Sequence, residues 1–203
     1  MIVLMSAFLL LSAFSCGGGN KANSTSEQSE ETAVNVPQFD ADSAYLYVKN
    51  QVDFGPRVPN TKEHVACGNY LAGQLEAFGA QVTNQYADLI AYDGTLLKAR
   101  NIIGSYKPES KKRIALFAHW DTRPWADNDP DEKNHNTPIL GANDGASGVG
   151  ALLEIARLVN QQQPELGIDI ILLDAEDYGA PQFYTGQHKD CLLYTSPSPR
   201  DRG

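Results

Sequence analysis

The chain of 203 residues has few basic residues, few cysteines and few histidines. Sixteen lysines and arginines stand against 25 aspartates and glutamates, which gives a formal net charge of −9. Because nucleic-acid binding needs a basic face, this acidic surplus excludes nucleic acid as an expected partner. Three cysteines and 42% hydrophobic residues exclude disulfide-rich, fibrous and fully disordered proteins. We expect Cys67 to be a buried free thiol, and His64 and His135, in polar surroundings, to be exposed.

The N-terminal apolar run is too short to cross a membrane. Residues 2–14 are thirteen in number and would rise about 20 Å in a helix, against a hydrocarbon core of about 30 Å. The run is instead typical of a signal peptide over residues 1–15, although no lysine or arginine precedes it. The small residues before Cys16 resemble a bacterial lipoprotein cleavage site, at which the cysteine becomes lipidated. An ordinary secretory signal cut near Ser15 is the alternative.

Two further segments lack apolar periodicity. Residues 16–37 are rich in Gly, Ser, Thr and Glu, so we expect a flexible tether between a lipid anchor and a folded domain. Residues 191–203 contain Ser-Pro-Ser-Pro-Arg, which continues neither a helix nor a central strand. We expect a non-native tail there, with a native disordered tail as the alternative. The protein would then be exported, face the periplasm or cell surface, and carry a C-terminally incomplete catalytic domain over residues 38–190.

Between these ends, apolar periodicity predicts alternating helices and strands. A first helix is capped by Asp40 and a second by Asn60, and a third follows at Ala146–Gln163. The first helix is expected to bury Ala44, Tyr45, Val48 and Val52. The predicted strands are Gln81–Tyr92, Thr95–Tyr106, Arg113–His119 and Ile168–Leu173. Because strand, crossover helix and strand make a βαβ unit, the fold class is α/β, with a mixed, mostly parallel central sheet flanked by helices.

Acidic and histidine side chains stand where these apolar runs end. They are His119, Asp121, Asp144, Glu176 and Asp177. Ligands of open α/β sheets bind at the carboxyl ends of the strands, so we expect the five side chains to converge. Carboxylates and imidazole suit a zinc site, and one of two adjacent carboxylates can bind metal while the other moves a proton.

Each of these residues alone has an ordinary structural interpretation. His119 could be a core histidine whose hydrogen bonds are satisfied, and Asp144 could cap the helix that follows it. Glu176 and Asp177 could form a solvated loop corner. It is their combination in this order that favours a metal site.

The motifs around these residues resemble the superfamily of zinc aminopeptidases and glutaminyl cyclases, and within it the bacterial lipoprotein-type glutaminyl cyclases. They read AHWDTRPWADNDP, ANDGASGVGALLEIAR and DIILLDAEDYGAP, with FGPRVPNTKEH nearer the N-terminus. The resemblance covers about residues 38–190. It implies a zinc exopeptidase-like fold and peptide or protein N-termini as substrates.

The resemblance also implies a role for each residue. Asp144 and Asp177 would bind zinc, and Glu176 would be the general base and acid. His119 and Asp121 would hold a second zinc in an aminopeptidase, or form polar surroundings for the metal in a cyclase. The family's third zinc ligand is a histidine far downstream, which this chain does not contain.

Two features of these motifs favour a cyclase. Aminopeptidases usually carry Glu-Glu where this chain has Glu176 and Asp177, here followed by Tyr-Gly-Ala-Pro. Trp120 and Trp125 are also cyclase-like and could wall an apolar pocket for a peptide N-terminus, with ordinary packing as the alternative. The first hypothesis is thus a one-zinc glutaminyl-peptide cyclotransferase that forms pyroglutamate and releases ammonia. The alternatives are a di-zinc aminopeptidase and an inactive surface lipoprotein, and the 203-residue chain alone is expected to be inactive.

Overall fold

The structure is a computed structural model that describes residues 35–186. The predicted signal peptide, Cys16, most of the predicted tether and the predicted tail of residues 191–203 lie outside the described residues. No helix of the described part is long and apolar enough to span a membrane. The elements are α1 (Ala41–Val52), α2 (Lys62–Ala77), β1 (Gln81–Ile90), β2 (Leu96–Tyr106), β3 (Arg113–His119), η1 (Glu132–Asn134), η2 (Ala142–Ala146), α3 (Ser147–Gln161) and β4 (Gly167–Leu173).

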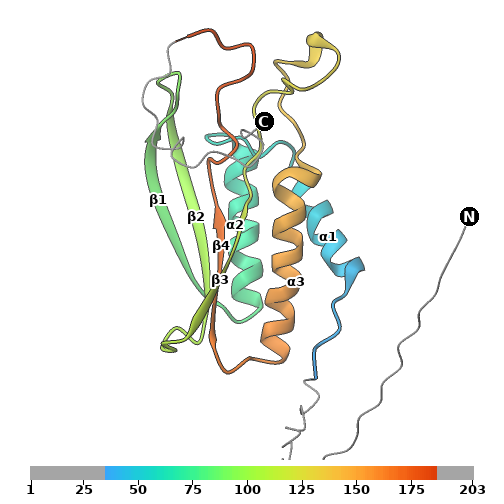
Figure 1. Ribbon diagram of the computed structural model, residues 1–203, viewed down its shortest axis with the longest axis vertical. Helices are drawn as coiled ribbons and strands as arrows, with labels where there is room; N and C mark the ends of the chain where they lie inside the picture. Colours follow the sequence, from blue (N-terminus) through green and yellow to red (C-terminus); the bar gives the residue numbers. More distant parts are fainter. Residues whose placement is uncertain (1–34, 187–203) are drawn as a thin grey trace, which may run out of the picture. The chain divides into compact units, whose positions relative to one another are not determined.

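The strands form one mixed sheet in the order β1-β2-β4-β3 (Figure 1). β1 and β2 pair as the predicted antiparallel hairpin, with Ile90 opposite Leu96. β3 and β4 run parallel on either side of α3 in the sequence, which confirms the predicted βαβ unit. The α/β class and the mixed sheet are confirmed. The expectation of a mostly parallel sheet does not hold for the described strands, because β1–β2 and β2–β4 are antiparallel and β3–β4 is parallel.

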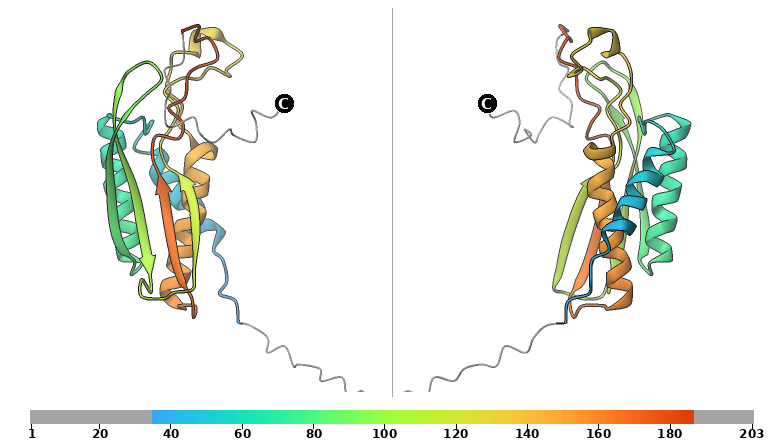
Figure 2. Two further views of the ribbon diagram at one scale, coloured as in Figure 1. Left: turned by 60° about the vertical axis from the view of Figure 1, so that its left-hand side comes forward. Right: turned by 90° about the vertical axis from the view of Figure 1, so that its right-hand side faces the viewer.

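The helices α2 and α3 pack against the sheet, and α1 packs against α3 (Figure 2). The helix α3 buries an apolar stripe along its length. This stripe consists of Val149, Leu152, Leu153, Ala156 and Val159. On α2, Leu71 and Leu75 are fully buried in the same core, together with the free thiol of Cys67, as predicted. This core supports the loops at one end of the sheet, where the strands β3 and β4 terminate.

The first helix departs from the predicted face at Tyr45, whereas Ala44, Val48 and Val52 are half-buried. Asp40 caps α1 as expected, because its carboxylate accepts hydrogen bonds from the next backbone N–H groups. The buried residues are Tyr47 and Gln51, whereas Tyr45 is 72% exposed. The Gln51 amide donates to the backbone carbonyls of Tyr47 and Ala146, so a hydrogen-bonded polar side chain occupies a core position that an apolar pattern does not reveal.

The second helix is capped by Thr61, and the prediction of Asn60 was wrong. The Thr61 hydroxyl accepts a hydrogen bond from the N–H of His64. Asn60 has a positive φ of 74°, and its amide bonds with the backbone of Leu96 and Lys98 on β2. Asn60 therefore ties the loop before α2 to the hairpin, a tertiary contact that displaces the cap by one residue.

Candidate metal centre

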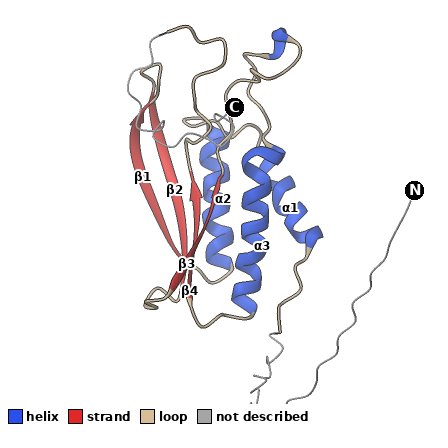
Figure 3. Ribbon diagram, in the orientation of Figure 1, coloured by secondary structure: helices blue, strands red, loops and turns tan. Residues whose placement is uncertain are grey.

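The predicted site residues lie at one end of the sheet, where β3, β4 and the start of α3 meet (Figure 3). β3 ends at His119, which is aligned with Leu173 at the end of β4. The irregular segment η2 leads into α3 at the same end and carries Asp144. Parallel strands with a crossover helix bring these three segments together, as the sequence predicts.

Three of the side chains are close enough to hold a metal ion. His119, Asp144 and Asp177 each offer one ligand atom, and these atoms lie within 4.8 Å of one another. His119 Nε2 is 3.0 Å from Asp144 Oδ1. His119 Nδ1 and Asp177 Oδ2 are buried without a hydrogen-bond partner, which is costly for polar atoms. Because a cation would satisfy such atoms, and imidazole and carboxylate are zinc ligands, the residues present fit zinc.

The crowding of carboxylates changes the acidity of the group. Burial by itself would lower the pKa of His119, but the adjacent carboxylates of Asp121, Glu176 and Asp177 raise it to about 9. Burial raises the pKa of Asp177 to about 6, and the negative charges of Asp121 and Asp144 add to this effect. Both shifts describe a site with more negative charge than the metal-free protein can balance.

Asp121 holds the backbone that carries Glu176 and Asp177. Its side chain is fully buried, and its two oxygens accept hydrogen bonds from Glu176 N at 3.2 Å and Asp177 N at 3.0 Å. One carboxylate just after β3 thus orients two consecutive residues after β4. Of the two residues expected to hold a second metal or to form polar surroundings, His119 belongs to the group of three possible ligands and Asp121 does not.

Glu176 is placed as an accessible carboxylate beside the possible ligands. Its side chain is 58% exposed, and Oε2 lies 3.8 Å from His119 Nδ1. The preceding Ala175 has a positive φ of 61°, and its N–H donates to Asp174. This unusual backbone turns the chain sharply after β4, so that Glu176 and Asp177 both reach the site.

A close approach of backbones explains the glycine after Asp144. Gly145 has φ 89° and ψ −68°, and a Cβ there would lie 2.8 Å from the Asp121 carbonyl oxygen. Only glycine combines this conformation with this contact. The segment that bears Asp144 is thereby packed directly on the segment that bears His119.

The structure also reveals a buried histidine that sequence reasoning missed. His64, expected to be exposed, is 3% exposed, and its Nε2 lies 2.9 Å from both oxygens of Asp174. The imidazole stacks on Trp120 at 4.3 Å between ring centroids. The N–H of Arg100 donates to the same carboxylate. The partner of His64 is 110 residues away, so no local pattern announces the pair. His135 is half-buried and donates to a backbone carbonyl.

The two tryptophans of the motif lie in different surroundings. Trp120 is fully buried, and its indole N–H donates to the Arg100 carbonyl, which favours the packing alternative for this residue. Trp125 is half-buried and contacts Tyr92 and Tyr178 edge to face, at 5.9 and 5.3 Å. Since Tyr178 follows Asp177, Trp125 belongs to an aromatic cluster beside the candidate metal centre.

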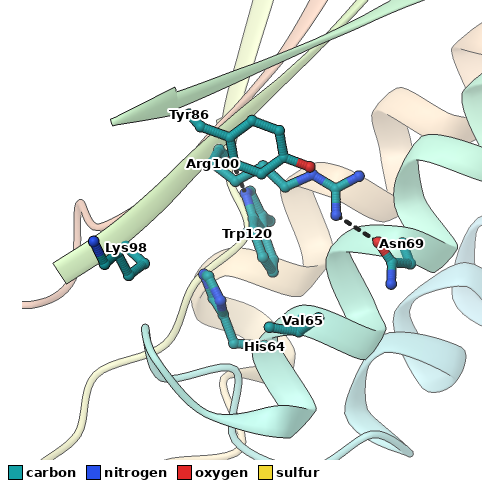
Figure 4. A pocket seen from close by; sticks show the side chains of 7 residues that line it. All are labelled: His64, Val65, Asn69, Tyr86, Lys98, Arg100 and Trp120. Atoms are coloured by element: carbon teal, nitrogen blue, oxygen red, sulfur yellow. Dashed lines mark hydrogen bonds between the residues drawn. The ribbon is translucent and has the colours of Figure 1, made fainter. Parts of the chain in front are cut away.

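A pocket of about 180 Å³ opens on the α2 side of Trp120 (Figure 4). Its lining consists of His64, Val65, Asn69, Tyr86, Lys98, Arg100 and Trp120. The Arg100 guanidinium is fixed by Asn69 and Asn84 and lies over the Tyr86 ring. None of the three possible metal ligands contributes to this lining, so the pocket is separate from the candidate metal centre.

The chain is similar to zinc-dependent exopeptidases and glutaminyl cyclases of known structure. The model of Peptidase family M28 matches residues 101–194. A glutaminyl cyclase of Bacteroides thetaiotaomicron, solved with N-acetylhistamine, is 95% identical and matches with a TM-score of 0.75 over 76% of this chain and 53% of its own. A leucine aminopeptidase precursor of the same organism is also 95% identical, with a TM-score of 0.76, over 77% and 54%.

More distant relatives agree with this assignment. A Zn-dependent exopeptidase of Parabacteroides distasonis is 64% identical, with a TM-score of 0.76, over 78% of this chain and 55% of its own. The uncharacterized protein YfbL of Escherichia coli is 35% identical over 131 residues, which are 64% of this chain and 36% of that protein. The chain spans about half the length of the solved structures and about a third of this curated relative.

Proposed function

Because the chain belongs to the superfamily of zinc aminopeptidases and glutaminyl cyclases, we propose that the protein converts N-terminal glutamine of peptides to pyroglutamate with release of ammonia. The observation that carries the proposal is the placement of an exposed Glu176 beside the group of His119, Asp144 and Asp177. An accessible base next to possible zinc ligands is what the cyclisation requires.

The reaction assigns a step to each of these residues. Asp144 and Asp177, with His119 beside them, would hold zinc, which when bound supplies a Lewis acid for the γ-carboxamide. Glu176 would take a proton from the α-amino group, whose nitrogen attacks the side-chain carbonyl carbon. The bond from this carbon to the amide nitrogen then breaks, and the Glu176 carboxyl returns the proton to the leaving ammonia. No water is consumed.

A zinc aminopeptidase is the second candidate. It is supported by the aminopeptidase name of a structure that is 95% identical, and by His119 lying within reach of both possible ligands. In that reaction Glu176 would deprotonate a water for attack on the first peptide bond. The two candidates share the residues of the site and differ in the nucleophile.

An assay with the full-length gene product and a Gln-initiated peptide separates the two. Release of ammonia with a peptide product of unchanged residue count supports the cyclase, whereas release of free amino acid supports the aminopeptidase. Glu176→Gln should reduce turnover by about 10² to 10⁴. Glu165→Gln is the matched control, because Glu165 is exposed and lies before β4, at the other end of that strand. Equal activity of both variants would contradict the role of Glu176.

We also propose that the protein is exported and held at a bacterial membrane by a lipid on Cys16. The proposal rests on the apolar run of residues 2–14 and on the small residues before the cysteine. Metabolic labelling with a fatty acid should mark the protein in a bacterial host, and Cys16→Ser should abolish the label. Labelling that persists in the variant would contradict it.

A further inference from the structure

Arg57 joins the two backbone segments that flank the candidate metal centre. It lies in the loop between α1 and α2, and its side chain is fully buried. Nε donates to the carbonyl of Trp120 at 3.3 Å, while Nη1 and Nη2 donate to the carbonyls of Leu140 at 2.5 Å and Gly141 at 2.9 Å. One planar guanidinium therefore bridges the end of β3 and the loop before α3.

These carbonyls belong to the segments that carry two of the possible metal ligands. Trp120 directly follows His119, and Gly141 precedes Asp144 by three residues. The distance of 3.0 Å between His119 Nε2 and Asp144 Oδ1 depends on how these segments are spaced. The guanidinium fixes the distance between the two segments through their backbone carbonyls, and it does not contact the side chain of either possible ligand.

The backbone around Arg57 reinforces the connection. The carbonyl of Arg57 accepts a hydrogen bond from Thr122 N at 3.2 Å. Gly141 has φ 55°, and a Cβ there would lie 2.4 Å from Thr122 Cγ2 and 2.7 Å from the Asp144 carbonyl oxygen. Because the two segments approach this closely only at glycine, a small shift of either would be transmitted to the ligands.

The charge of Arg57 supports a role at the site rather than in general packing. Among the described residues, Arg57 forms no ion pair. Burial lowers its pKa, and attraction to the charges of Asp121 and Asp177 opposes that shift. A buried guanidinium without a paired carboxylate is expensive for the fold. Three donors in a rigid fork give a geometric reason for its presence that an apolar side chain could not replace.

We propose that Arg57 is a positioning residue that holds the segment bearing Asp144 against the end of β3, and so sets the position of Asp144 for zinc binding. The inference rests on the proposed zinc site. Its consequence is that a change at Arg57 lowers metal affinity more than its effect on folding stability accounts for. If Arg57 had only a structural role, its substitution would lower zinc affinity and folding stability in the same proportion.

Arg113 provides the matched control. Its guanidinium also donates to backbone carbonyls, those of Tyr106 and Ile168 at 3.3 Å each, and it pairs with Asp169. It stands at the start of β3, whereas the candidate metal centre stands at the end of that strand. Arg113→Met therefore removes a comparable set of bonds without touching the segments at the metal centre.

The experiment measures zinc affinity of the full chain by competition with a chromophoric chelator, and folding stability by urea denaturation without metal. Arg57→Met should lower zinc affinity by about 10- to 100-fold, and Arg57→Lys should restore part of it, since an ammonium reaches fewer of the carbonyls. Arg113→Met should leave affinity within about threefold at a similar loss of stability. Equal losses of affinity in the Arg57 and Arg113 variants would overturn the proposal.

A metal-free measurement keeps the inference apart from the proposed function. Hydrogen exchange should accelerate at two amides in Arg57→Lys and not in Arg113→Lys. They are the amide of Thr122, which donates to the Arg57 carbonyl, and the amide of Ala146, which donates to the Gly141 carbonyl. Unchanged exchange there would refute the positioning role even if the wild-type chain bound no zinc. The wild-type chain could instead fail to bind zinc while hydrogen exchange in Arg57→Lys changes as expected. That result would count against the zinc site and would support the role of Arg57 in holding the two segments together. If Arg57→Met does not fold, Arg57→Lys decides both measurements.

Discussion

The molecule contains two clusters of histidine and carboxylate, and they differ in how completely their polar atoms are satisfied. In the first, the two oxygens of Asp174 accept hydrogen bonds from Arg100 N and Ala175 N, and both lie within 2.9 Å of His64 Nε2. In the second, His119 Nδ1 and Asp177 Oδ2 are buried without a hydrogen-bond partner, and His119 Nδ1 has only longer contacts with the carboxylates of Asp121 and Glu176. The two clusters are built from the same residue types at the same end of the sheet.

This difference indicates that the His64 cluster stabilises the fold and that the His119 cluster is available for binding. A satisfied buried pair fixes one conformation, and its loss leaves a charge without a partner. A cluster with unsatisfied polar atoms lowers the stability of the fold, but those atoms remain able to bind a ligand such as a metal ion. We therefore expect changes in the His64 cluster to act on folding and changes in the His119 cluster to act on metal binding.

The largest effect on stability is expected from His64→Leu. The change leaves the Asp174 carboxylate buried without its cationic or donor partner, which should cost about 3 to 5 kcal/mol of unfolding free energy. Urea denaturation of the metal-free chain measures it. His135→Leu is the matched control, because His135 is half-buried and makes a single hydrogen bond to the Asp129 carbonyl. A loss of less than 1 kcal/mol in His64→Leu would remove the distinction between the clusters.

His119→Gln should show the opposite profile. Zinc affinity should fall by about 100-fold, equivalent to about 2.7 kcal/mol, because one of the three possible ligands is removed. Folding stability without metal should fall by only about 1 kcal/mol, because the part-buried contact of Nε2 with Asp144 is lost, whereas Nδ1 has no hydrogen bond. Competition with a chelator and urea denaturation give the two values. If the variant lost folding stability and kept its zinc affinity, His119 would have a structural role like that of His64.

The smallest effect concerns the pH dependence of Asp177→Asn. The pKa of Asp177 is raised from 3.8 to about 6 in the fold, so the protonated form is favoured by folding. Its contribution to stability is therefore full below about pH 4 and is lost as the pH rises through 6. Because asparagine has no proton to lose, the variant should gain about 2 kcal/mol on the wild type between pH 4 and 7, with EDTA present.

The control for this prediction has the opposite sign. Asp169 bonds to Arg113, which lowers the pKa of its carboxyl, so its contribution is present above the unfolded pKa and is lost as the pH falls. Asp169→Asn should therefore lose stability relative to the wild type as the pH rises. Unfolding curves at four pH values distinguish the two variants. Parallel curves for wild type and Asp177→Asn would show that burial does not alter this carboxyl.

Local pattern is enough to predict the elements that form the sheet end. The run Arg113–His119 is a strand with the predicted bounds, because short apolar runs between charges leave little choice. It lies at an edge of the described sheet, however, and Ile114 and Phe117 are exposed. The helix α3 likewise buries the predicted stripe. The convergence of His119, Asp144 and Asp177 follows from strand order, which a βαβ unit constrains.

The remainder depends on contacts that are distant in the sequence. His64 is buried because Asp174 lies against it from the far end of the chain, and its own neighbours are polar. Arg57 stands in a loop whose glycine and prolines indicate a turn, and nothing local shows that four carbonyls accept from its side chain. The burial and hydrogen bonds of His64 and Arg57 depend on tertiary contacts, so the periodicity of a single sequence cannot identify them.

The two hydrogen bonds that Asp121 accepts have a consequence for motion. Glu176 and Asp177 are both attached to this one carboxylate, which stands just beyond the end of β3, whereas they themselves follow β4. Sliding of one strand past the other would move Glu176 and Asp177 together. The distance between the backbones of Glu176 and Asp177 and the Asp121 carboxylate is thus kept when the strands of the sheet move relative to one another.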